Sequence, residues 1–228
     1  MKIGGFQKQS LIDYPGKICS IVFTIGCNFR CPFCQNSELV VPEKVKNTEE
    51  IPEDFIFSYL KGRKLLDAVE ITGGEPTLQP DLKNFAKRLK KMGFLVKLDT
   101  NGSDPDTLKE LLDSKLVDYI AMDIKAPLEK YNEVAGTNVD VEKIKESIKI
   151  VKRAPDFEFR ITVVPRFHKE KDLIAVAKLV KGTKLVLQQF RPRNTLDPSL
   201  EKETYTEAQL KEFAKKLKPY VEKVEVRS

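Results

Sequence analysis

Six apolar segments rich in β-branched residues recur along the chain, and each has the length of one β-strand. Most are nearly continuous apolar runs, such as SIVFTI at residues 20–25, a pattern that is typical of strands whose two faces are both covered. The expected strands are residues 19–26, 68–73, 94–100, 117–124, 158–165 and 184–190.

Segments with helical periodicity separate these strands. Between residues 81 and 92 the apolar positions recur with the spacing of one helix face, and Gly93 supplies an end signal. Strands that alternate with helices pair in parallel through right-handed crossovers. We therefore expect an α/β fold in a single domain over residues 1–228, with its core at about 17–198. An incomplete (β/α)6 barrel of parallel strands, a partial TIM barrel, is our prediction, and an open doubly wound sheet is the alternative. Further helices are expected at residues 105–116, 141–151 and 172–180.

Both ends of the chain add elements to this unit. Residues 13–16, DYPG, place proline and glycine at positions that turns favour, so a short N-terminal hairpin is expected before the first parallel strand. A helix at residues 206–218 and a strand at 223–227 are expected to finish the chain.

The net charge of +6 is spread along the chain. The basic runs at residues 87–91 and 215–218 lie in amphipathic helical patterns without interleaved aromatic residues. This arrangement indicates solvated helix faces and no nucleic-acid partner. No stretch approaches the roughly 18 consecutive apolar residues of a membrane span. Residues 1–6 contain no apolar signal-peptide core, so we expect a cytoplasmic protein without a membrane partner.

Three of the four cysteines fall within eight residues, directly after the first parallel strand. Cys27, Cys31 and Cys34 form a C-x3-C-x2-C loop. Thiolates are natural ligands of iron–sulfur clusters, and three of them leave the fourth iron of a cubane open. Structural zinc, the alternative, needs four ligands. Cys19 begins the strand, about 20 Å or more away by strand rise, and is interpreted as a buried or strand-edge thiol.

The cysteine loop has an aromatic residue, Phe33, directly before its last cysteine. This C-x3-C-x-aromatic-C arrangement resembles the signature of the radical S-adenosylmethionine superfamily. The resemblance implies one [4Fe–4S] cluster on Cys27, Cys31 and Cys34, whose open iron chelates the methionine moiety of S-adenosylmethionine. It also implies reductive cleavage of that cofactor to a 5′-deoxyadenosyl radical.

The second expected strand ends in TGGEP, residues 72–76. Active sites of α/β folds lie at the carboxyl ends of parallel strands. Gly73 and Gly74 let the backbone come close to a ligand, and Glu75 can accept hydrogen bonds from an ammonium group. The segment looks like the family's GGEP motif, which holds the amino group of the cofactor. In isolation, a turn that places a glutamate at a helix N-terminus would explain it equally well.

Two aspartates end the next two strands, Asp99 in DTNG and Asp123 in MDIK. Carboxylates at the ends of adjacent parallel strands repel each other unless a cation or Lys125 lies between them. The pair is similar to that of glycyl radical enzyme activating enzymes. The resemblance implies that Asp99, Asn101, Asp123 and Lys125 serve the cofactor, and that both aspartates bind a monovalent cation, for which oxygen ligands are suited. Solvent-facing loop caps are the alternative.

Four further polar residues are assigned with less support from the pattern. The resemblance places Asn36 and Gln189 near the adenosyl part of the cofactor. Arg160, if it points inward from its strand, needs an anionic partner such as the cofactor carboxylate. An outward orientation is the alternative for Arg160 and Gln189. His168 is expected on the surface.

The resemblance spans residues 7 to about 198 and includes QSLIDYPG at residues 9–16. It is strongest to the short activating proteins of anaerobic ribonucleoside-triphosphate reductase. It implies hydrogen abstraction from a glycine of such a partner enzyme, with electrons from a low-potential donor such as flavodoxin or ferredoxin. Only Cys19 remains outside the loop, so no second cluster is expected. The alternatives are a radical enzyme that acts on a small molecule, like 7-carboxy-7-deazaguanine synthase, and a zinc-binding adaptor without catalysis.

Overall fold

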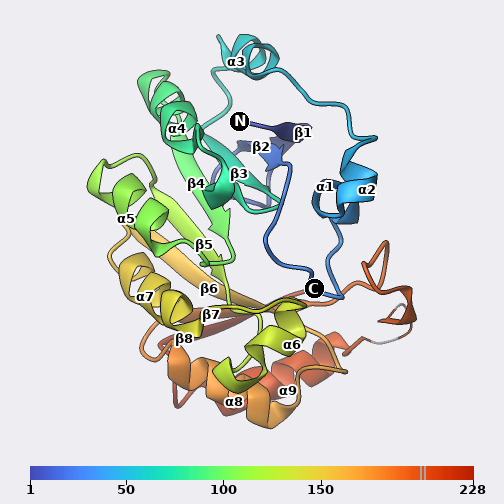
Figure 1. Cartoon of the computed structure of the whole chain (residues 1–228). Helices are drawn as coiled ribbons and strands as arrows, with labels where there is room; N and C mark the ends of the chain where they lie inside the picture. The colour runs from blue at the N-terminus through green and yellow to red at the C-terminus, as the bar shows by residue number, and fades with distance from the viewer. Residues whose placement is uncertain (201, 203) are drawn as a thin grey trace.

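A curved sheet of eight strands follows the order of the chain (Figure 1). The computed structural model describes residues 1–200, 202 and 204–228. β1 is antiparallel to β2, and each later strand is parallel to the one before it. The strands are β1 (Ile3–Ser10), β2 (Cys19–Thr24), β3 (Ala68–Gly73), β4 (Leu95–Thr100), β5 (Tyr119–Asp123), β6 (Asp156–Val163), β7 (Lys184–Gln189) and β8 (Lys223–Arg227).

Helices connect the parallel strands. They are α1 (Ser37–Val40), α2 (Pro42–Val45), α3 (Glu53–Leu60), α4 (Leu82–Lys91), α5 (Pro105–Asp113), α6 (Tyr131–Ala135), α7 (Val141–Val151), α8 (Glu170–Leu179) and α9 (Glu207–Leu217). Short 3-10 turns cover Pro76–Leu78, Leu128–Lys130 and Pro198–Leu200. In Figure 1, α4, α5, α7 and α8 lie outside the curve of the sheet. None of the helices in the described ranges is long and apolar enough to cross a membrane.

The sheet is an incomplete barrel. Its order runs from β1 at one edge to β8 at the other, and among the described residues these two edge strands are not paired with each other. The predicted α/β fold with a partial barrel and an antiparallel N-terminal pair is therefore confirmed. The strand expected at the end of the chain, β8, joins the barrel as a seventh parallel strand.

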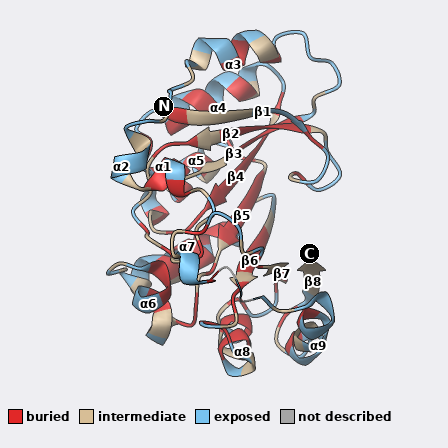
Figure 2. Cartoon of the chain, turned by 90° about the vertical axis from the view of Figure 1, so that its right-hand side faces the viewer, coloured by how far each residue is buried: buried red, intermediate tan, exposed pale blue. Residues whose placement is uncertain are grey.

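The main core lies between the sheet and its outer helices. Helix α4 buries Leu82, Phe85, Ala86 and Leu89, the face that its periodicity predicts. These residues share one hydrophobic cluster with apolar side chains of the strands. In Figure 2 the buried residues follow the strands and the inner sides of the helices. Each large apolar side chain buried here contributes about 1.5–3 kcal/mol to the free energy of folding.

A second cluster closes the amino end of the barrel interior. Cys19, Ala68 and Tyr119 are the first residues of β2, β3 and β5, and all three belong to this cluster. Tyr14 of the DYPG turn packs against Tyr119, with 5.5 Å between the ring centroids. Burial raises the pKa of the Cys19 thiol to about 12. The amino end is thus apolar and packed, and Cys19 lies at the opposite end of β2 from the cysteine loop.

Candidate active site

A cavity of about 250 Å³ lies at the carboxyl ends of β2 to β5. Most of the residues that the sequence predicts for the site contribute to its wall. These are Cys27, Cys31, Phe33, Cys34, Asn36, Gly73, Gly74, Glu75, Asp99, Asn101, Asp123 and Lys125. The wall also contains five polar or aromatic residues to which the pattern assigned no role, Phe29, Gln35, Thr72, Thr100 and Thr162.

The cysteine loop is held by segments that are distant in the sequence. On one side, the Arg30 amide donates a 2.8 Å hydrogen bond to the Ala135 carbonyl at the end of α6. The next residue, Gly136, has φ +65°, and a Cβ there would lie 2.2 Å from the Arg30 carbonyl oxygen. On the other side, the Leu196 amide donates to the Cys34 carbonyl at 3.1 Å, and the Asp197 amide donates to the Pro32 carbonyl at 2.8 Å. The loop is therefore fixed on both flanks by backbone contacts.

The three thiols lie in a desolvated environment. Burial raises the pKa of Cys27 to about 12 and that of Cys31 to about 11, and it raises the pKa of Cys34 as well. Thiolates are stable there only beside strong positive charge, which bound iron supplies. In the described parts of the chain, no three His, Cys, Asp or Glu side chains are grouped around a single-ion site. Three soft donors on one preformed loop fit a cluster whose irons each take one thiolate.

The Gly-Gly-Glu segment lies against the backbone that follows β2. The Gly74 amide donates to the Thr24 carbonyl and the Glu75 amide donates to the Gly26 carbonyl, both at 2.8 Å. A Cβ at Gly74 would lie 2.0 Å from the Gly26 oxygen. The glycine is therefore required by a close backbone approach, which brings this segment beside the cysteine loop.

The Glu75 carboxylate is 1% exposed and accepts four hydrogen bonds. One oxygen accepts from the Thr77 hydroxyl at 2.6 Å, the Thr77 amide at 3.1 Å and the Thr100 hydroxyl at 2.8 Å. The other oxygen, Oε2, accepts from the Asn101 amide at 2.7 Å. Burial raises the pKa of Glu75, although the donors of Thr77 and Asn101 oppose the shift. Glu75 thus links the end of β3 to the end of β4, and Oε2, which accepts one hydrogen bond, retains acceptor capacity in a residue that lines the cavity.

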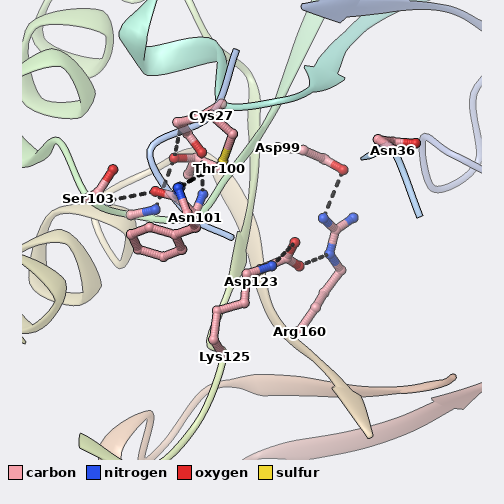
Figure 3. Close-up of polar contacts among 12 residues, drawn as sticks. Cys27, Asn36, Asp99, Thr100, Asn101, Ser103, Asp123, Lys125 and Arg160 are labelled. Carbon is pink, nitrogen blue, oxygen red and sulfur yellow. Dashed lines mark hydrogen bonds and ion pairs between the residues drawn. The ribbon is translucent and has the colours of Figure 1, made fainter. Parts of the chain in front are cut away.

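Asp99 and Asp123 lie close together, as predicted, and the guanidinium of Arg160 lies between them (Figure 3). Arg160 points inward, and its anionic partners are these two aspartates. Burial alone would raise the pKa of Asp123, but Arg160 and then Lys125 lower it. The pKa of Asp99 is likewise lowered by Arg160 and then by Lys97, against the effect of burial. Both carboxylates are therefore ionised and paired.

Two asparagines link the loops around the cavity. The Asn36 amide group donates to the Gly73 carbonyl at 3.1 Å, which joins the cysteine loop to the Gly-Gly-Glu segment. The Asn101 amide group donates to Asn28 Oδ1 at 3.0 Å and lies 3.8 Å from the Cys27 sulfur (Figure 3). Three loops from three strands thereby form one connected wall.

Two expectations differ from the structure. His168, expected on the surface, is fully buried: Nδ1 accepts from the Val164 amide at 3.0 Å, and Nε2 lies 2.8 Å from the Lys125 carbonyl. A carbonyl can only accept, so Nε2 carries the proton. The surface prediction was wrong because the loop after β6 turns back against Lys125. Gln189 donates to the Tyr205 carbonyl at 2.8 Å, and among the described residues that line the cavity neither Gln189 nor Arg160 is present.

The burial of His168 predicts acid sensitivity. Burial lowers its pKa from 6.5 to about 4, so between these values the unfolded chain binds a proton that the folded chain does not. Acid therefore favours unfolding, and this residue should lower the free energy of unfolding by about 2 kcal/mol between pH 7 and pH 5. Urea unfolding of the wild type and of His168→Gln at both pH values measures the effect. The stability of the wild type should fall more steeply, and parallel pH profiles would contradict the assignment.

Three comparisons with known proteins bear on this cavity. A family model described as the radical SAM superfamily matches residues 21–180. A Methanocaldococcus jannaschii protein, provisionally named a glycyl-radical enzyme activating enzyme, is 38% identical over 99% of this chain and 95% of its own length. The pyruvate formate-lyase-activating enzyme of Clostridium pasteurianum is 30% identical over 54% of this chain and 52% of its own.

Among solved structures, Streptococcus suis SuiB has a similar fold, with a TM-score of 0.71 and 16% identity over 91% of this chain and 48% of that chain. The same protein has been solved with S-adenosylmethionine bound. The family model covers more than half of the chain, and the Methanocaldococcus relative covers nearly all of it. This chain therefore belongs to the radical S-adenosylmethionine superfamily of enzymes, whose members use a [4Fe–4S] cluster together with S-adenosylmethionine.

Proposed function

We propose that this enzyme generates a radical on a glycine of a partner protein similar to anaerobic ribonucleoside-triphosphate reductase. One observation carries the proposal: the three thiols and the Gly-Gly-Glu loop share one cavity in a chain that matches a glycyl-radical enzyme activating enzyme over almost its whole length. Membership of a catalytic family excludes the zinc-binding adaptor considered above.

Cys27, Cys31 and Cys34 would hold the cluster, and Phe33 packs beside them. When bound, the cluster and S-adenosylmethionine supply the one-electron chemistry that yields the 5′-deoxyadenosyl radical. The chain contributes the shape and polarity of the site. The ring of Phe33 lies 6.2 Å from that of Phe167 in a tilted arrangement and makes a T-shaped contact with Phe190, and this aromatic packing helps to exclude water from the thiols.

The cavity wall offers complementary groups for an amino acid moiety. Glu75 Oε2 and the carbonyl side of the Gly73-Gly74 segment can accept hydrogen bonds from an ammonium group. Lys125 brings positive charge for a carboxylate to this wall, whereas Arg160 is paired with Asp99 and Asp123. Asn36 is fixed to Gly73 and would lie beside the adenosyl part.

The partner and the electron donor follow from the proposed reaction. A glycine inside another protein must reach the cavity as part of an extended segment. A low-potential donor such as flavodoxin or ferredoxin must reduce the cluster, because cleavage of the sulfonium bond consumes one electron.

Electron paramagnetic resonance tests the proposal. The anaerobic enzyme, S-adenosylmethionine, a low-potential reductant and the glycyl radical protein of the source organism are mixed and frozen. The expected result is the doublet of an α-glycyl radical on the partner, and its loss when Cys31→Ala replaces the wild type. Turnover of a small metabolite, with no radical on any glycyl radical protein of the organism, would instead support a small-molecule radical enzyme.

A further inference from the structure

We propose that the guanidinium of Arg160 takes the place of a monovalent cation between Asp99 and Asp123. Cofactor cleavage by this enzyme is then independent of the alkali metal supplied. The proposal concerns the cofactor site of the proposed function. It rests on that function only for the measurement of cleavage rates.

The first argument is that every oxygen of both carboxylates already has a cationic partner, and Figure 3 shows the contacts with Arg160. Asp99 Oδ1 lies 2.6 Å from Lys97 Nζ, and Asp99 Oδ2 lies 2.8 Å from a terminal nitrogen of Arg160. Asp123 Oδ1 lies 2.8 Å from Arg160 Nε, and Asp123 Oδ2 lies 3.2 Å from Lys125 Nζ. An alkali ion would have to displace these charge-assisted hydrogen bonds to gain carboxylate ligands.

The register of the sheet builds this arrangement. Asp123 on β5 and Arg160 on β6 are direct neighbours across the two strands. Asp99 on β4 is the neighbour of Ala121 on β5, two residues before Asp123 and therefore on the same face. Arg160 reaches across β5 to Asp99, and we infer that the small side chain of Ala121 permits this. A bulkier residue at position 121 would block that path.

The buried Lys97 also contacts this pair of aspartates, through Asp99. Lys97 is 1% exposed and lies 3.1 Å from Glu70, its neighbour on β3, as well as 2.6 Å from Asp99. Its stem is therefore fixed in the barrel interior. Because Lys97 holds one oxygen of Asp99, the other oxygen is turned toward Arg160.

The charges of this network are balanced without an added ion. Three carboxylates, from Glu70, Asp99 and Asp123, alternate with three cations, from Lys97, Arg160 and Lys125. Glu70 Oε2 is buried and has no hydrogen-bond partner among the residues that the structure describes, and burial together with Asp99 raises the pKa of Glu70 well above its usual range. Protonation of Glu70 would leave an excess of positive charge, which further disfavours a cation.

Thallium binding tests the proposal without any catalytic step. Tl⁺ replaces K⁺ in oxygen-ligand sites and is observed directly by ²⁰⁵Tl NMR. The full-length cluster-loaded wild type should show no specific Tl⁺ site. Arg160→Met leaves Asp99 and Asp123 with one cationic partner each, and this variant should bind one Tl⁺ per chain. Arg153→Met, which removes an exposed arginine that pairs with Asp113, should behave like the wild type.

Cleavage rates provide the second measurement. The wild type should cleave S-adenosylmethionine at rates within about twofold of each other in sodium, potassium and tetramethylammonium salts, since the site gains nothing from the ion. Arg160→Met should lose at least about tenfold in tetramethylammonium and recover part of that loss in potassium. A wild type that binds one Tl⁺ and slows in tetramethylammonium would overturn the proposal. The wild-type measurements decide the question even if the variant does not fold.

Discussion

Replacing Cys31 by alanine should abolish the iron–sulfur cluster and all cleavage of S-adenosylmethionine. In the proposed site the cluster would have three thiolate anchors on one loop, so the loss of one would leave a second iron without a protein ligand. Cys31 is buried in the cavity wall, and among the described residues the only other thiols at this end of the barrel are those of Cys27 and Cys34. Anaerobic wild type should contain about four irons per chain, and the variant should contain almost none. Iron analysis and the spectrum of the reduced protein measure the difference.

Cys19→Ala is the matched control. It removes a buried thiol of the same chain, but from the packed amino end of the barrel. The variant should retain its iron and its activity. Loss of the cluster in Cys19→Ala, or its retention in Cys31→Ala, would contradict the assignment of the three ligands.

Replacing Glu75 by alanine should destabilise the protein and weaken cofactor binding together. The change removes the acceptor of four buried hydrogen bonds, which are donated by the amide and hydroxyl of Thr77, the hydroxyl of Thr100 and the amide of Asn101. Unpaired buried donors cost about 1–3 kcal/mol each before relaxation, so the free energy of unfolding should fall by roughly 4 kcal/mol. In the proposed site the Glu75 carboxylate would accept a hydrogen bond from the ammonium group of S-adenosylmethionine. Its loss should therefore also lower the affinity for that cofactor.

Anaerobic urea unfolding and calorimetric titration with S-adenosylmethionine measure the two effects. Glu43→Ala, which removes an exposed carboxylate of α2, should change neither. If Glu75→Ala kept wild-type stability and lost only affinity, Glu75 would serve as a ligand and not as a tie between strands. If Glu75→Ala lost stability but the folded variant kept its affinity for S-adenosylmethionine, the role of Glu75 would be only to link β3 to β4.

The strands and long helices could be predicted because each has a continuous or periodic apolar pattern that reflects its burial. The helices α1, α2 and α6 have four or five residues each, too few to display a period. They are set by tertiary contacts, such as the hydrogen bond from Arg30 to Ala135. A short helix of this kind leaves no signal in the sequence.

The site was predictable where spacing and strand ends coincide, as for the cysteines and Asp99. Lys97 was missed although it carried a signal: a charged residue in an apolar strand, two positions before Asp99 and so on the same face. The inward orientation of Arg160 could not be derived, since one step in register reverses the face of a strand. His168 was missed because its partners, Val164 and the Lys125 carbonyl, are backbone groups whose approach only the fold determines.

The backbone contacts on both flanks of the cysteine loop have a consequence for the repair of a damaged iron–sulfur cluster. Ala135, Leu196 and Asp197 hold the loop through groups that contain no sulfur or metal. These hydrogen bonds form without a metal ligand, so part of the entropic cost of ordering the loop is met when the chain folds. Oxygen that destroys the cluster would leave a receptive scaffold, and iron and sulfide could rebuild the centre in place, without a cycle of unfolding and synthesis of new protein.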